Sequence, residues 1–140
     1  MADLISHIEQ ARHNEKCANY LLENAPEFRD WAITAAFYAA VHLVEACFTS
    51  QGDIGHTETA LERRAKDEEK HRYRARKVKE LAHGAYDSYR GLYEASSNVR
   101  YLTKPIEYYD EEAARKFVRK HLFNVRTELE KAFGLNLTIS

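Results

Sequence analysis

The sequence predicts an all-α fold, an antiparallel up-and-down bundle of four to five helices that forms a single domain over residues 1–140. Ala, Leu, Glu, Lys and Arg dominate, and only five Gly and two Pro occur in 140 residues, a composition typical of helical proteins. Apolar residues recur at three- and four-residue steps along most of the chain. The length is that of one domain with one sizeable core.

The central element is the apolar run at residues 31–48, WAITAAFYAAVHLVEACF. It predicts a helix from Glu27 to about Ser50 that is apolar almost all round and therefore buried. The run is short for a bilayer span, and a His and a Glu near its middle would be costly there, so we expect no membrane association. Its polar residues form one stripe, which either pairs internally or faces a second subunit or a cleft: Thr34, Tyr38, His42 and Glu45.

Helices are expected on both sides of this run. Apolar residues at helical spacing predict a first helix over about residues 3–24, and Pro26 suits the first turn of the next one. The segment QGDIGHT reads as a loop. Residues 57–70 are highly charged and predict a short exposed helix, and the sequence leaves open whether residues 57–82 form one helix or two.

A long helical pattern follows over about residues 72–101. Gly84 and Gly91 weaken it locally, and one of them is a candidate for a kink or a break. Residues 102–109 contain a Pro and read as a loop. Asp110 is a predicted N-cap for a final helix that ends near Phe133, where Gly134 is placed to stop it.

The charge is uneven along the chain. The net charge of −1 argues against a protein whose whole surface binds nucleic acid, but residues 70–79, KHRYRARKVK, carry six Lys or Arg and no acid. Such a run can hold a phosphate backbone while a tyrosine stacks on a base. The candidate residues for RNA or phosphate binding are Lys70, Arg72, Tyr73, Arg74, Lys77 and Lys79.

A candidate catalytic group follows the basic run. On a continuous helix Arg76 and His83, seven residues apart, would share one face with Tyr86. A His can act as general acid or base on an RNA 2′-hydroxyl or leaving oxygen, and an Arg can stabilise the added charge at phosphorus. The alternative is chance crowding of Arg and His, because the pair Arg64 and His71 has the same spacing.

The remaining residues with possible chemistry give weaker indications of function. Arg100 and Tyr101, at a predicted helix end, form either an anion site or a contact that closes the bundle. The two Cys make neither a zinc motif nor a disulfide framework, and the seven His are scattered, so we expect no metal and no cofactor. The first residues lack a signal-peptide pattern, and we expect a cytoplasmic protein.

Several segments, taken in order, resemble the HEPN family, and most closely a branch of small stand-alone prokaryotic members. The resemblance covers nearly the whole chain and includes the final amphipathic helix. The segments that carry it are ARHNEKCANYLL, DWAITAAFYAAVHLVEACF, GDIGHT, Tyr89-x2-Leu92, and Arg100-Tyr101 before the Pro loop.

The resemblance implies a helical bundle that is usually a homodimer. It also implies a role in toxin–antitoxin or antiviral defence, in which many members are metal-independent endoribonucleases and some pair with a nucleotidyltransferase-type antitoxin. The RNase motif of the family, Arg-x4-6-His, matches best at Arg76-Lys77-x5-His83-Gly-Ala-Tyr86. It departs from that motif in the Lys after the Arg and in a Tyr three rather than two residues past the His.

In the enzymatic interpretation His83 is the general acid or base, Arg76 stabilises the transition state, and Tyr86 orients or stacks the substrate. The alternative is a non-catalytic module that binds a nucleotide, an RNA or a partner protein through the basic face and the polar stripe of the central helix. A third interpretation is a purely structural helical adaptor.

Overall fold

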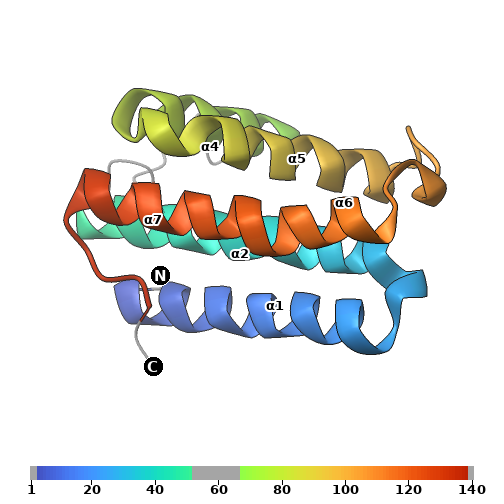
Figure 1. Ribbon diagram of the computed structural model, residues 1–140. Coiled ribbons are helices and arrows are strands. Elements are labelled where there is room, and N and C mark those ends of the chain that lie inside the picture. The colour runs from blue at the N-terminus through green and yellow to red at the C-terminus, as the bar shows by residue number, and fades with distance from the viewer. Residues whose placement is uncertain (1–2, 52–66, 139–140) are drawn as a thin grey trace.

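The computed structural model describes residues 3–51 and 67–138, and it is an all-α bundle, as predicted (Figure 1). Four helical segments alternate in direction along the bundle. A fifth helix, α4, comes before the third of these segments in the sequence. In chain order they are α1 (Leu4–Asn24), α2 (Arg29–Ser50), α4 (Asp67–Leu81), α5 (Tyr86–Arg100) and the continuous run of α6 (Glu111–Arg115), a π-helical segment η4 (Lys116–His121) and α7 (Leu122–Phe133). Short 3-10 turns lie at η1 (Pro26–Phe28), η2 (His83–Ala85) and η3 (Ile106–Tyr108).

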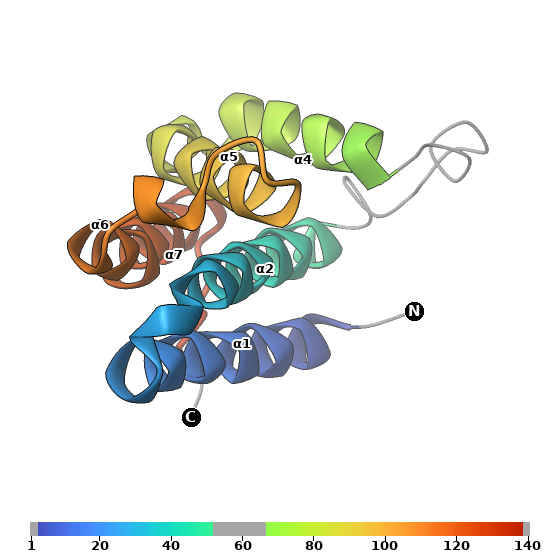
Figure 2. The same cartoon turned by 90° about the vertical axis from the view of Figure 1, so that its right-hand side faces the viewer.

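The central helix is α2. In Figures 1 and 2, α4 and α5 lie on one side of the bundle, α1 lies on the opposite side, and α2 lies between them beside α7. Residues Pro26–Ser50 are long and apolar enough to cross a membrane by length and composition, yet 78% of the most apolar window is buried inside the bundle. The prediction of a buried core helix is therefore confirmed.

The first and the last helix begin at a capping Asp, and the last helix ends at a Gly. Asp3 Oδ1 accepts from the Ser6 N–H at 2.8 Å, and Asp110 Oδ1 accepts from the Ala113 N–H at 2.8 Å. Each carboxylate satisfies an N–H that has no partner inside its helix. Gly134 stops α7 in the left-handed conformation, with φ 65°. The two caps predicted for the last helix, Asp110 and Gly134, are thus confirmed, and the Asp3 cap is seen only in the structure.

The long helical pattern over residues 72–101 is broken beside Gly84, one of the two places where the sequence allowed a break. The chain leaves the helical conformation at Ala82, with φ −146° and ψ 63°, and α4 and α5 are separate helices joined by η2. Ala85 of this turn is fully buried, and a Cβ on Gly84 would overlap the carboxylate of Glu128 on α7. The break therefore occurs where a small residue lets the turn pack closely against α7.

In the region where the sequence predicts a short exposed helix, the structure describes the start of α4, which begins at Asp67. The remainder, residues 57–66, lies outside the described residues, and so does Arg64. The last helix contains the π-helical segment η4, which the sequence pattern did not predict.

Candidate functional site

The polar stripe of α2 pairs with side chains of three other helices. Its first member, Thr34, donates its hydroxyl to the Asp30 carbonyl at 2.9 Å. The other members pair as follows: Tyr38 Oη accepts from Arg100 Nη1 at 3.0 Å, His42 Nδ1 lies 3.0 Å from His7 Nδ1, and Glu45 Oε1 accepts from Arg74 Nε at 2.6 Å. Of the alternatives left open by the sequence, the structure thus shows internal pairing. Thr34 pairs within α2, and the other three residues pair with α5, α1 and α4.

The ion pair between Arg74 and Glu45 lies in the interior. Only 15% and 12% of the two side chains are exposed. Burial alone would lower the pKa of the Arg74 guanidinium, but Tyr89 and Glu45 beside it raise that pKa above its usual value. The structure therefore takes Arg74 away from the exposed basic face on which the sequence placed it, and that part of the phosphate-binding prediction is corrected.

Arg74 also fixes the imidazole of His71, one turn earlier on α4. Its Nη1 lies 3.0 Å from His71 Nδ1. A guanidinium can only donate, so Nδ1 must accept, and the proton of the neutral ring is on Nε2. The His71 ring packs against Phe37 and Tyr93, with centroid distances of 5.2 and 5.7 Å. Packing and hydrogen bonding thus hold this ring in one orientation and one tautomer.

His71 faces a cleft of about 330 Å³ between α4 and α5, which we call the His71 cleft. Its other lining residues are Tyr93, Ser97, Arg100 and Tyr101.

Arg100 is held firmly in this cleft. Its Nε donates to Ser96 Oγ at 3.1 Å, and its guanidinium lies over the rings of Tyr38 and Tyr101 at 5.5 and 5.2 Å. Such cation–ring contacts are strongest where water is partly excluded. Tyr101 is 69% exposed and forms the outer rim. The cleft therefore combines a fixed cation, a fixed imidazole and accessible aromatic surface.

A second hollow of about 340 Å³ adjoins the His71 cleft through Tyr93, and we call it the basic hollow. Four cations and one acid line it together with aromatic side chains. Of these, Arg90 and Glu94 pair with each other at 2.7 Å, both largely exposed. The remaining lining residues are Arg72, Ala75, Arg76, Lys79, Tyr86 and Tyr93.

The three predicted catalytic residues are not brought together on one helix face. Arg76 and Tyr86 line the basic hollow, whereas His83 is not among its lining residues. Because α4 ends at Leu81, the argument that Arg76 and His83 lie two turns apart on one helix is wrong. His83 is exposed on the turn η2, which packs against α7.

The other predicted phosphate-binding residues lie on or near the surface of α4. Arg72 and Lys79 line the basic hollow, and the Lys79 ammonium lies 5.3 Å from the centre of the Tyr86 ring. Arg76 and Lys77 both lie over the Tyr73 ring, at 5.2 and 5.7 Å. Lys70 is half-buried in the first turns of α4. Except for Arg74, the basic run therefore forms a cationic and aromatic surface.

Sequence reasoning did not select His71, Tyr93 and Ser97 as site residues. A signal was present, because His71, Arg74 and the buried Val78 follow one another at i, i+3 and i+7 on the inner face of α4. Tyr93, Ser97 and Arg100 follow one another at i, i+4 and i+7 and also share one face of α5. Neither face could be recognised without knowing that α4 and α5 pack against each other.

Within the described ranges, 3–51 and 67–138, no group of three or more His, Cys, Asp or Glu side chains could hold a metal ion. Comparisons with protein-family models, curated proteins and solved structures gave no match. The resemblance to the HEPN family therefore stays a prediction from the sequence, and function is argued from the site itself.

Proposed function

We propose that this chain is a HEPN-like RNA-binding protein of toxin–antitoxin or antiviral defence type, and that it binds single-stranded RNA across the basic hollow and the His71 cleft. The observation that carries the proposal is the convergence of His71, Arg100 and Tyr101 on one cleft that adjoins a cationic hollow. Both cavities lie on the surface shared by α4 and α5.

The chemistry of this surface suits a single strand. Arg76 and Lys79 supply positive charge for the phosphate backbone, and each lies against a tyrosine ring. Exposed and half-exposed rings, above all Tyr101 and Tyr93, offer faces on which unpaired bases stack. Arg100, held by Ser96 and Tyr38, offers a positioned cation to a phosphate at the end of this track.

The second candidate function is metal-independent cleavage of the RNA in the same cleft, and the presence of an imidazole and a fixed guanidinium in one cleft favours it. His71 lines the cleft together with Arg100, and Arg100 stabilises the negative charge that builds up at phosphorus. In this version Arg100 takes the charge-stabilising role that the sequence assigned to Arg76, and His71 is the imidazole beside it in the cleft.

Binding is tested with a fluorescein-labelled single-stranded RNA by anisotropy at several salt concentrations. The variant Arg76→Gln/Lys79→Gln is expected to bind at least about tenfold more weakly. Its affinity should also depend less steeply on salt, because each lost phosphate contact lowers the number of counterions that binding releases. The matched control is Arg115→Gln/Lys131→Gln, which removes two exposed cations outside this surface. Equal loss in both variants, or in neither, would overturn the proposal.

Cleavage is tested in EDTA with the wild type, His71→Gln and His83→Ala. Glutamine retains an oxygen that accepts from Arg74, so the fold is kept and circular dichroism checks it. Cleavage that His71→Gln abolishes and His83→Ala preserves supports the second candidate. Loss of cleavage only in His83→Ala supports the prediction made from the sequence. RNA binding without cleavage by any of the three proteins supports a non-catalytic RNA-binding protein.

A further inference from the structure

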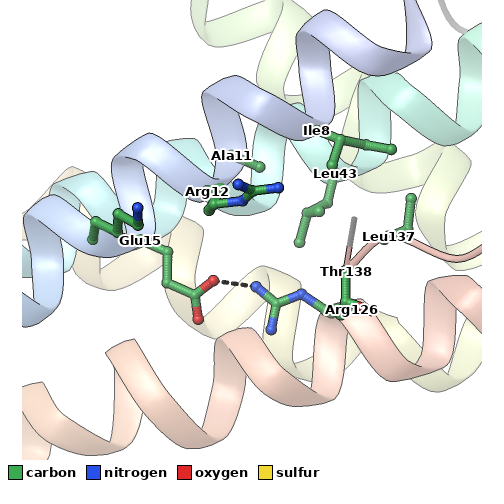
Figure 3. A pocket seen from close by; sticks show the side chains of 9 residues that line it. Ile8, Ala11, Arg12, Glu15, Leu43, Arg126, Leu137 and Thr138 are labelled. Atoms are coloured by element: carbon green, nitrogen blue, oxygen red, sulfur yellow. Dashed lines mark hydrogen bonds and ion pairs between the residues drawn. The ribbon is translucent and has the colours of Figure 1, made fainter. Parts of the chain in front are cut away.

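A separate cavity of about 390 Å³ lies on the opposite half of the bundle from α4 and α5. Its walls come from α1, from α7 and from the segment after α7, as Figure 3 shows. Nothing in the proposed RNA surface uses these residues, so any function of this cavity is a second one.

The α1 wall is one continuous face of that helix. Ile8, Ala11, Arg12, Glu15 and Lys16 follow one another at i, i+3, i+4, i+7 and i+8. The two apolar members come first and are 2% exposed, and the charged members follow. One end of the cavity wall is therefore apolar and the other end is charged.

The apolar end continues on other elements. Leu43 of α2 lies behind it, and Leu137 closes it from the segment after α7 (Figure 3). That segment is anchored, because Gly134 turns the chain and the Leu137 N–H donates to Glu130 Oε2 at 2.8 Å. The apolar end is thus a built pocket wall.

The charged end has more cations than acids. Arg126 reaches from α7 to Glu15 and pairs with it, and their side chains are only 14% and 28% exposed (Figure 3). Arg12 and Lys16 line the same cavity and form no ion pair with any carboxylate among the described residues. After the Glu15–Arg126 pair is counted, two positive charges face the cavity.

We propose that this cavity binds a small organic anion with a short apolar body. The anionic head lies against Arg12 and Lys16, and the body points toward Ile8, Leu43 and Leu137. The volume falls within the range of small-molecule sites, in which a mainly apolar lining is combined with a few polar groups that fix orientation. Arg126 positions Glu15 and keeps that carboxylate from repelling the head.

The probes are octanoate, octyl phosphate, 1-octanol and acetate, each titrated into ¹⁵N-labelled full-length protein and followed by NMR. Octanoate and octyl phosphate carry the anionic head and the apolar body, 1-octanol lacks the charge, and acetate lacks the body. Saturable shifts are expected for the two anions at the backbone amides of residues 8–16 and 135–138, and the tighter of the two identifies the head group. Octanol and acetate are expected to bind at least about tenfold more weakly, a difference of about 1.4 kcal/mol.

The variant Arg12→Gln/Lys16→Gln is expected to weaken binding of the preferred anion at least about tenfold, whereas Arg115→Gln/Lys131→Gln leaves it unchanged. Affinity for RNA should be unchanged in Arg12→Gln/Lys16→Gln, so this site and the proposed function fail or succeed separately. Shifts confined to α4 and α5, equal binding of octanol, or an unaffected Arg12→Gln/Lys16→Gln variant would each overturn the inference.

Discussion

At the scale of single residues, His42 of the polar stripe lies partly buried among titratable groups. Burial lowers the pKa of its imidazole, Arg74 lowers it further, and Glu45 opposes both. The contact between His42 Nδ1 and His7 Nδ1 also allows only one proton between the two nitrogens. The folded bundle therefore favours the neutral form of His42.

A dependence of stability on pH follows from this. Above about pH 6.5, the usual value, His42 is neutral in the folded and unfolded chains, and its stabilising contribution is complete. As the pH falls below that value, the unfolded chain takes up the proton first, so the free energy of unfolding decreases until the lower pKa of the folded state is passed.

Urea unfolding at about pH 7.5 and about pH 5.5 measures this loss. The variant His42→Gln is expected to lose less stability than the wild type over that interval. Part of the dependence should remain, because burial, Lys120 and Lys116 also lower the pKa of His121. The same loss in His42→Gln and in the wild type would contradict the assignment to His42.

At the scale of helices and turns, local residue chemistry sets the ends, and long-range packing sets the interruptions. The caps of Asp110 and Gly134 could be predicted because each satisfies backbone groups within a few residues. Gly84 indicated where the long pattern could break, but it did not show that the chain leaves the helix at Ala82 and that η2 packs against Glu128, more than 40 residues later.

Gly134 gives the test at this scale. Its φ of 65° is a conformation that L side chains rarely adopt, and a Cβ would meet no other atom within 4 Å. Backbone strain is therefore the main cost of Gly134→Ala, which we expect to lower the free energy of unfolding by about 1 kcal/mol. Gly134→Asn should cost less, since Asn tolerates this region better. Urea unfolding compares the two, and equal losses would point to a cause other than φ.

The candidate site could be predicted only in part, for the same reason. The basic run and Arg100 were found because charge is visible in the sequence, and Tyr38, His42 and Glu45 because they form a helical stripe. Which basic residue turns inward was not visible. Arg74 pairs with Glu45, which is 29 residues away in the sequence, and this one contact moves Arg74 inside and fixes His71 beside the cleft.

At the scale of the whole molecule, α2 ties the elements together. It packs against α1, α5 and α7, and its buried face combines five Ala with larger side chains such as Phe37 and Phe48. Small residues allow the neighbouring helices to approach closely, and the large ones fill the remaining volume. Exposure of the inner face of α2 therefore requires the bundle to come apart.

The two cysteines report on this opening. Cys17 is exposed on α1, whereas Cys47 is fully buried on α2, where burial and then Glu130 raise the pKa of its thiol to about 12. Only a thiolate reacts quickly with a disulfide reagent. In native protein we expect one thiol to react with dithionitrobenzoate at once and the second only at the rate of global unfolding. Cys17→Ser should remove the fast phase alone, and in denaturant both thiols should react. A Cys47 that reacts in native Cys17→Ser faster than the bundle unfolds would mean that α2 becomes exposed by local opening, and that the packing around it is not one cooperative unit.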